Sequence, residues 1–316
     1  MKDGKIGIAM IGCGQIANAH LKAMESIDNA ELVSAMDVVE EKAVAVAQRY
    51  NANAYTSLED VLNNDDVDAV ILPLPHHLHH PVAIQCAKAG KHILVEKPMA
   101  LNEKELKELV DILKETKVPY LTGFNRRFSS FAKRIKEIIK NRENPLIINY
   151  QMNAGFLPKN HWTQTETGGG RNIGEACHIY DLFTYLTESE IEKISAFSLN
   201  PRTEKYLKND NFTVNLKFKD GSICNLIYVA LGAREYPKEQ MKIYFDGKMI
   251  LLNDYKEMKV FGVKIKGLKM RQDKGHFSEI EEFAQAIKNG SGYPISIWQL
   301  TQATKISFEV EKQINL

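Results

Sequence analysis

The chain has 316 residues, of which 44% are hydrophobic and 26% are charged, and its 41 Lys and Arg residues balance 40 Asp and Glu residues to a formal net charge of +1. This length predicts two domains, or one core with a large appendage, and the charge balance excludes a general electrostatic attraction to nucleic acid or to an anionic membrane. The apolar runs are far shorter than the ~20 residues of a membrane-spanning helix. Since the N-terminus does not look like a secretory signal, we expect a cytoplasmic protein.

Residues 1–124 show an alternation of strand-like and helix-like segments. Short apolar runs predict strands buried on both faces, and apolar residues at helical spacing predict the helices between them. Such an order implies right-handed crossovers and an α/β fold with a doubly wound parallel sheet. In chain order, the expected strands are Lys5–Ile11, Leu32–Met36, Val67–Leu74, His92–Val95 and Pro119–Phe124, and the expected helices are Ile16–Ile27, Glu40–Tyr50, Leu58–Leu62, His80–Ala89 and Glu103–Thr116.

Residues 125–316 have a different pattern and predict a second, α+β domain with a large, mostly antiparallel open sheet. Asp220-Gly221 and Asp246-Gly247 each predict a hairpin turn between two strands. The exposed face of this sheet is an expected oligomer contact, and the closing helices could pack back on the first domain. The expected helices are Phe128–Lys140, Phe277–Ile287 and Ile297–Ile314, and the expected strands are Phe212–Phe218, Ile223–Leu231, Met241–Phe245, Met249–Leu252 and Met258–Val263.

A glycine-rich loop follows the first predicted strand. Gly12 permits a tight turn, Gly14 lets the backbone approach a pyrophosphate, and Ala17 permits close packing of the next helix. Gln15 and Ile16 complete the loop and are also expected at the cofactor. Asp37 ends the second strand, where a carboxylate accepts hydrogen bonds from the ribose hydroxyls and repels a 2′-phosphate. The sequence therefore predicts a dinucleotide site that favours NAD over NADP.

Lys97 follows the strand His92–Val95 within Glu96-Lys97-Pro98. The carboxyl ends of parallel strands border the ligand crevice, and a Lys there can polarise a carbonyl or exchange a proton. On spacing alone, a solvated surface Lys beside a turn proline is the favoured alternative.

Three stretches, taken in order, resemble the Gfo/Idh/MocA family of oxidoreductases, which includes glucose–fructose oxidoreductase and inositol dehydrogenase. The resemblance implies an N-terminal Rossmann domain, a C-terminal domain whose open sheet forms oligomer contacts (a homodimer or homotetramer), and a cis bond between Lys97 and Pro98. It also implies that Lys97 is the catalytic acid/base and that hydride passes from a secondary hydroxyl of a sugar, cyclitol or nucleotide sugar to NAD(P). The three stretches are Gly12–Ala17, Lys88–Pro98, and Gly168–Gly170 with the later His178 and Asp181.

One position departs from the family pattern. The family often has Asp four residues before its His, but here Gly174 occupies that position and Glu175 follows it. We interpret Lys97 and His178 as the proton-handling pair. Glu175 either supplies the missing charge or points away from the site. Without the resemblance, a core histidine satisfied by a backbone carbonyl is an equal alternative for His178.

Four histidines occur between positions 76 and 80, where the family segment usually reads T-P-N-x-x-H. His76 replaces the Asn, and His79 keeps the His. No third protein ligand with suitable spacing is evident, so no metal site is predicted. We instead assign Pro75, His76 and Glu96 to the cofactor crevice.

Substrate contacts are predicted at five positions. An Arg side chain can bind hydroxyls, a carboxylate or a diphosphate, and an indole face stacks on a sugar ring. An interdomain ion pair and a core anchor are the respective alternatives. The predicted contacts are Asn125, Arg127, Trp162, Asn172 and Tyr236.

The leading hypothesis is an NAD-dependent dehydrogenase that acts on a small polyol, sugar or nucleotide sugar. A second is a redox-neutral glycoside hydrolase or lyase that uses NAD transiently. A third is a non-catalytic, dinucleotide-sensing regulator, which Lys97 and His178 argue against.

Overall fold

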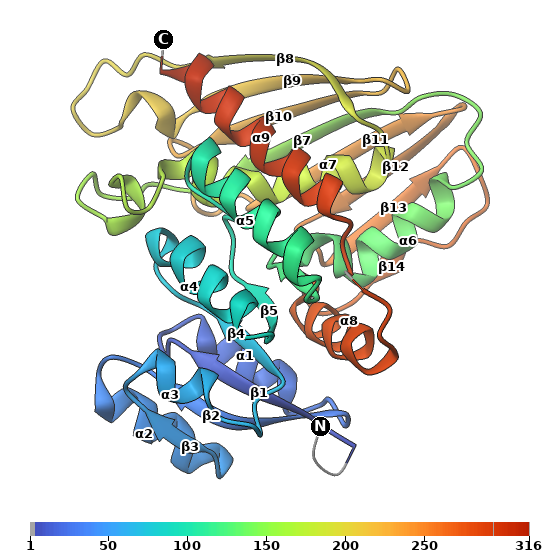
Figure 1. The fold of residues 1–316 in the computed structure, drawn as a ribbon. Coiled ribbons are helices and arrows are strands. Elements are labelled where there is room, and N and C mark those ends of the chain that lie inside the picture. The colour runs from blue at the N-terminus through green and yellow to red at the C-terminus, as the bar shows by residue number, and fades with distance from the viewer. Residues whose placement is uncertain (1–3, 293, 316) are drawn as a thin grey trace. The chain divides into compact units, whose positions relative to one another are not determined.

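The structure is a computed structural model that describes residues 4–292 and 294–315. It divides into two compact units (Figure 1). Unit 1 comprises the residues up to Gly123 together with His276–Leu300, and unit 2 comprises Phe124–Gly275 and the residues from Thr301 on. The first boundary lies one residue before the one expected from the sequence, and part of the C-terminal helical region belongs to unit 1.

Unit 1 contains, within the described residues, a six-stranded parallel sheet with strand order β3-β2-β1-β4-β5-β6. The strand order reverses between β1 and β4, and this reversal is the switch point beside which doubly wound folds bind ligands. The predicted α/β class is confirmed. The elements are β1 (Ile6–Ile11), α1 (Ala17–Met24), β2 (Ala30–Met36), α2 (Glu40–Tyr50), β3 (Asn53–Tyr55), α3 (Leu58–Leu62), β4 (Ala69–Leu72), α4 (His76–Lys88), β5 (His92–Val95), α5 (Glu103–Thr116), β6 (Tyr120–Thr122) and α8 (His276–Asn289).

The central strands of unit 1 are apolar because helices cover both faces of the sheet. Every residue of β1 and β4 is buried. The side chain of Asn102 caps α5 by accepting a hydrogen bond from the backbone N–H of Glu105 at 3.0 Å. Leu106, Leu109 and Leu113 form the buried stripe of that helix. Helix α8 packs against α1 and β1.

Two elements of unit 1 differ from the sequence prediction. Helix α4 begins at His76, four residues earlier than expected, and contains Pro81 in its second turn. The prediction placed this proline in the first turn, which is the position that proline favours. Strand β3 was not predicted, because Asn53–Tyr55 is a short, largely exposed edge strand without apolar alternation.

Unit 2 contains, within the part of the chain described, an eight-stranded sheet with strand order β14-β13-β12-β11-β7-β10-β9-β8. Its ladders are antiparallel except that β7 and β10 are parallel, which confirms the mostly antiparallel prediction. The elements are η1 (Asn125–Phe128), α6 (Ser130–Ile139), β7 (Ile147–Asn153), η2 (Trp162–Gln164), η3 (Asn172–Ala176), α7 (Cys177–Thr187), β8 (Ile191–Ser198), η4 (Lys208–Asp210), β9 (Phe212–Phe218), β10 (Ile223–Val229), β11 (Glu239–Phe245), β12 (Lys248–Asn253), β13 (Glu257–Phe261), β14 (Leu268–Lys269) and α9 (Ile297–Ile314), whose first four residues belong to unit 1.

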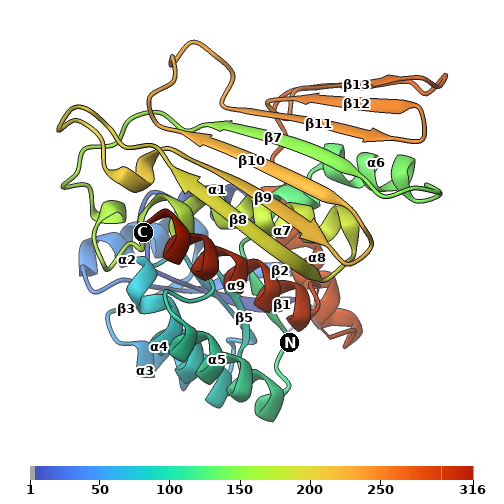
Figure 2. The ribbon, with the colours of Figure 1, turned by 90° about the horizontal axis from the view of Figure 1, so that it is seen from above.

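Helices α6, α7 and α9 cover one face of this sheet (Figure 2). Along β9, buried and exposed residues alternate strictly, as expected for a sheet with one covered face. The other face exposes several large apolar side chains, and its predicted role as an oligomer contact stays a prediction. These side chains include Ile147, Phe197, Ile223, Ile227 and Tyr244.

None of the helices in the described residues is both long enough and apolar enough to cross a membrane.

Candidate functional site

The glycine-rich loop of unit 1 has the shape that a dinucleotide requires. Gly12 has φ +101°, and a Cβ there would lie 3.0 Å from the side chain of Leu74 and 3.1 Å from the carbonyl oxygen of Pro73. A Cβ at Gly14 would have, apart from Gly14 and its two chain neighbours, no heavy atom of the described residues within 4 Å, so the backbone is open to a ligand. Ile16, which precedes α1, is half-exposed. The loop therefore fits a pyrophosphate at the N-terminus of α1.

Asp37 is fixed directly beside this loop. Its Oδ2 accepts a hydrogen bond from the backbone N–H of Cys13, and its Oδ1 accepts one from the backbone N–H of Val39, each at 2.9 Å. A carboxylate has about four acceptor positions, so capacity for two ribose hydroxyls remains. Burial and the charge of Asp37 raise the pKa of the Cys13 thiol to about 11, which keeps that thiol neutral.

The turn that carries Lys97 begins directly after β5. The Lys97–Pro98 peptide bond is cis, as the family resemblance implies. The Nε2 of His20 lies 2.8 Å from the Oε1 of Glu96, and the Oε2 of Glu96 accepts the backbone N–H of Lys97 at 3.3 Å. Burial raises the pKa of Glu96, but the hydrogen bond and charge of His20 and the charge of Lys97 outweigh it and lower the pKa to about 2. Glu96 is therefore a carboxylate that holds the turn.

The four histidines of residues 76–80 have separate environments. His76 is buried with its ring centroid 5.5 Å from that of His79. Both ring nitrogens of His79 face backbone carbonyls, and His80 lies 3.1 Å from the carboxylate of Glu108. His77 is exposed. Within the described residues, no three His, Cys, Asp or Glu side chains are placed to hold a metal ion.

In unit 2, His178 is the second residue of α7 and follows the π-helical turn η3, a distortion often found at functional sites. Its side chain is 6% exposed and makes an edge contact with Phe124 at 6.1 Å between ring centroids. One turn later, Asp181 holds the guanidinium of Arg127 with contacts of 2.8 and 2.6 Å. Arg127 also lies over the ring of Tyr185. The guanidinium of Arg127, which the sequence predicted to bind substrate, therefore binds Asp181.

Glu175 makes its bonds toward the sheet of unit 2. Its Oε1 accepts a hydrogen bond from the Nζ of Lys238 at 2.7 Å, and its Oε2 accepts one from the hydroxyl of Tyr228. Arg171 lies 3.8 Å away. Burial raises the pKa of Glu175, but the charges of Lys238 and Arg171 outweigh this effect and lower the pKa to about 2. Glu175 is therefore an ionised partner of Lys238.

The other predicted substrate contacts fall into two groups. Asn125 and Asn172 are buried. The side-chain amide of Asn172 donates to the carbonyl of Ser307 at 2.7 Å and to Glu311 at 2.8 Å, and it accepts from the hydroxyl of Tyr180 at 2.7 Å. By contrast, the side chains of Trp162 and Tyr236 are 45% and 47% exposed.

Tyr236 lines a pocket of about 600 Å³ that lies within unit 2. Asn153, Lys238 and Asp254 also line it, so it offers both donors and acceptors of hydrogen bonds. An exposed aromatic ring beside such groups is suited to a polyhydroxylated ligand.

Sequence reasoning missed the residues that hold others in place. His20, Lys238 and Tyr228 bond to Glu96 or Glu175. A signal existed for His20, because it lies three residues after Ala17 on the same face of α1, which packs on the sheet. Lys238 and Tyr228 are 63 and 53 residues from Glu175, and no local pattern marks them.

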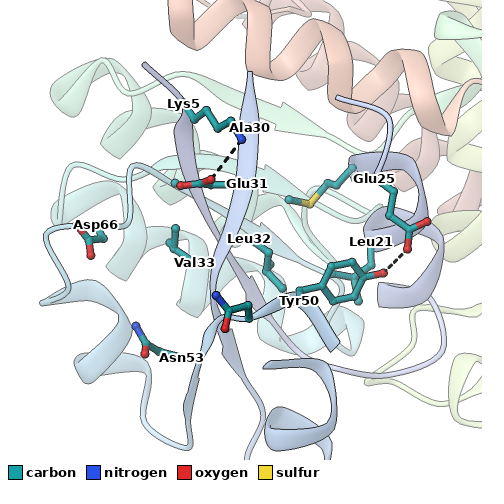
Figure 3. A pocket seen from close by; sticks show the side chains of 13 residues that line it. Lys5, Leu21, Glu25, Ala30, Glu31, Leu32, Val33, Tyr50, Asn53 and Asp66 are labelled. Carbon is teal, nitrogen blue, oxygen red and sulfur yellow. Dashed lines mark hydrogen bonds and ion pairs between the residues drawn. The ribbon is translucent and has the colours of Figure 1, made fainter. Parts of the chain in front are cut away.

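Unit 1 has a pocket of about 480 Å³ (Figure 3), which lies at the end of the parallel sheet opposite to the Gly12 loop. Lys5, Gly7 and Ala30 are among its lining residues and lie at the amino ends of β1 and β2. On its rim, the hydroxyl of Tyr50 donates to Glu25 at 2.8 Å. This pocket is therefore separate from the loop of Gly12 and from Asp37, which follow the carboxyl ends of these strands.

Comparisons with known proteins match each of the two units to a domain of one oxidoreductase family. Residues 6–124 match a family model described as an oxidoreductase family with an NAD-binding Rossmann fold. Residues 136–307 match the C-terminal alpha/beta domain of the same oxidoreductase family.

Relatives with assigned activities act on small molecules. The chain is 28% identical over 222 residues to a myo-inositol 2-dehydrogenase of Thermotoga maritima, covering 68% of this chain and 66% of that protein. It is 32% identical over 229 residues to a 4-carboxy-2-hydroxymuconate-6-semialdehyde dehydrogenase of Sphingobium, covering 69% and 70%. Its fold matches a UDP-N-acetylglucosamine 3-dehydrogenase of Acidithiobacillus ferrooxidans with a TM-score of 0.84, 21% identity, and coverage of 98% and 97%.

Proposed function

The chain belongs to the Gfo/Idh/MocA family of oxidoreductases, with an NAD-binding Rossmann domain, and we propose that it oxidises a secondary hydroxyl of a sugar, a cyclitol or a nucleotide sugar with NAD. The observation that carries the proposal is the position of Lys97, directly after β5 on the sheet edge that also bears the Gly12 loop and Asp37. The inositol and UDP-sugar dehydrogenases among its relatives support this substrate class.

Oxidation of the hydroxyl releases a hydride from carbon and a proton from oxygen. Bound NAD supplies the hydride acceptor. We assign the proton to Lys97 and His178, since an uncharged amine and an uncharged imidazole can each accept a proton from a hydroxyl. Glu96, held by His20, keeps a negative charge next to Lys97 and fixes the backbone of its turn.

Substrate binding in this proposal uses exposed rings more than buried polar groups. Trp162 and Tyr236 offer faces on which a sugar or cyclitol ring could stack. Arg127 and Asn172 instead support the helix of His178, since Arg127 holds Asp181 and Asn172 bonds to Tyr180, and both partners lie on α7. Asn125 also stays a proposed contact.

The test is the absorbance of NADH when the purified protein meets NAD, or NADP, and a panel of inositols, free sugars and UDP-sugars. We expect reduction of NAD, and little reduction of NADP, with one class of substrate. If a substrate is cleaved while no NADH accumulates, the chain is a redox-neutral enzyme. If NAD binds and no substrate of the panel reacts, the proposed substrate class is wrong.

A further inference from the structure

His79 is completely buried, and both of its ring nitrogens contact backbone carbonyl oxygens. Its Nε2 lies 2.8 Å from the oxygen of Leu74, shortly after β4. Its Nδ1 lies 2.9 Å from the oxygen of Pro98, which follows Lys97 directly. One imidazole therefore bridges the chain segments that leave two neighbouring strands of the parallel sheet.

The protonation of this bridge is constrained. A carbonyl oxygen accepts hydrogen bonds and never donates them, and a neutral imidazole has a single N–H. A neutral His79 thus donates to either Leu74 or Pro98, and both bonds form together only in the imidazolium. A buried acceptor that loses its donor is destabilising, so the bridge is strongest when the ring carries two protons.

The bridge acts on the turn that bears Lys97. His20 fixes the residue before Lys97 through the Glu96 carboxylate, and His79 fixes the residue after it through the Pro98 carbonyl. We propose that His79 is a positioning residue, which holds the Lys97 turn against the end of β4 and thereby sets where the amine of Lys97 lies. This inference rests on the proposed role of Lys97.

Charged and titratable groups around His79 determine the pH at which its ring takes up a second proton. Burial lowers the pKa of His79 from the usual 6.5, while its two carbonyl partners and the charge of Glu96 act in the opposite direction. Lys97 lowers the pKa, and the ring of His76 packs nearby. The ring is thus mainly neutral at neutral pH, and it gains its second donor as the pH falls further below 6.5.

The experiment compares His79→Gln with His77→Gln, the same substitution on an exposed residue two positions earlier in α4. A glutamine side chain can reach one of the two carbonyls but cannot bridge them. We expect kcat for His79→Gln to fall about 10- to 100-fold relative to wild type at pH values below 6.5, where His79 can make both bonds, because a misplacement of about 1 Å can cost a hundredfold. The affinity for NAD should change less than about twofold, and backbone amides of residues 93–101 should exchange hydrogen faster.

A purely structural role would lower the thermal stability of His79→Gln and leave the pH dependence of kcat unchanged. Positioning through two bonds instead predicts that the ratio of wild-type kcat to His79→Gln kcat rises as the pH falls below 6.5. Any pH dependence that the two proteins share cancels in this ratio. A ratio near one, or a pH-independent ratio, overturns the proposal, and so does unchanged hydrogen exchange of residues 93–101.

Two further measurements keep the outcome decisive. If His79→Gln does not fold, nitrogen-15 NMR of the wild-type histidine rings replaces it. One buried ring that gains a second proton below pH 6.5, as kcat/KM changes, supports the bridge, and a His79 ring that stays singly protonated overturns it. If Lys97→Ala turns over substrate at the wild-type rate, the proposed function fails, while the hydrogen exchange still reports on the bridge.

Discussion

The polar residues of the two units are used differently. In unit 1, two predicted cofactor residues at strand ends face open space or keep acceptor positions: Gly14 borders open space, and Asp37 retains acceptor positions. In unit 2, several predicted site residues have their bonding capacity filled from within, as with Arg127 on Asp181 and Asn172 on Glu311. Arg127 and Asn172 thus support other residues of unit 2.

The difference follows from how each sheet is made. The carboxyl ends of parallel strands collect at one edge, so a motif after any strand of unit 1 is brought to the same place. In the mostly antiparallel sheet of unit 2, strand ends alternate between two edges. Polar groups there meet partners that are distant in sequence, such as Asn172 and Glu311, 139 residues apart.

The largest expected effect is at Lys97. Lys97→Ala should lower kcat about a thousandfold, since a positioned acid/base contributes about 10²–10⁴-fold, and should leave NAD affinity within about twofold. Steady-state kinetics and NAD titration measure the two quantities. Lys104→Ala, at a highly exposed position of unit 1, is the control and should match wild type. Wild-type kcat in Lys97→Ala would remove Lys97 from the mechanism.

The next effect tests whether Asp37 selects the cofactor. Asp37→Asn should weaken NAD binding about tenfold, because bonds to a charged acceptor become bonds to a neutral one. NADP binding should weaken less, since the repulsion of its 2′-phosphate is also lost. Titrations of both cofactors, with the exposed Glu41→Gln as control, give the ratio. An unchanged preference for NAD over NADP would show that another group makes the selection.

A smaller effect concerns the stability that Glu175 gives to unit 2. The pKa of Glu175 is lowered from 4.5 to about 2, so its contribution is full above pH 4.5 and is lost as the pH falls toward 2. Glu175→Gln should cost about 2 kcal/mol at neutral pH and flatten this acid dependence. Urea unfolding at several pH values measures both.

Glu192→Gln is the matched control, because Glu192 pairs with Lys217 at 2.8 Å while both side chains are about half exposed. That pair should contribute less than about 1 kcal/mol. Equal losses in the two variants would mean that burial of Glu175 adds nothing to its pair with Lys238.

The smallest expected effect is the change in kcat caused by Glu175→Gln. Since its oxygens bond to Lys238 and Tyr228, Glu175→Gln should change kcat less than about threefold. A loss of about a hundredfold or more would instead mean that Glu175 supplies the charge missing at Gly174. The kcat of this variant, measured where it is fully folded, decides between the two.

The sequence predicted much of the fold because local patterns agreed with the tertiary structure. Glu40–Tyr50, His92–Val95 and Glu103–Thr116 have the expected bounds. The strands β7 and β8 were not assigned individually. Ile191–Ser198, for example, has few buried residues, so its hydrophobic alternation is weak.

For the site, the sequence predicted the motifs at strand ends but not which side chains bond to each other. Gly12, Asp37 and Lys97 are identified by their order relative to predicted strands. Whether Arg127 faces a ligand or Asp181 depends on how residues 54 positions apart pack, which no local pattern specifies. The roles of His20 and His79 likewise depend on contacts with other strands.

The most direct test of the account is the fate of hydrogen from the oxidised carbon. A substrate from the reactive class, deuterated at that carbon, is incubated with the protein and NAD, and both products are analysed by mass spectrometry. The account predicts one deuterated NADH for each oxidised product, with Lys97→Ala forming both about a thousandfold more slowly. Product that forms without an equal amount of deuterated NADH would contradict it.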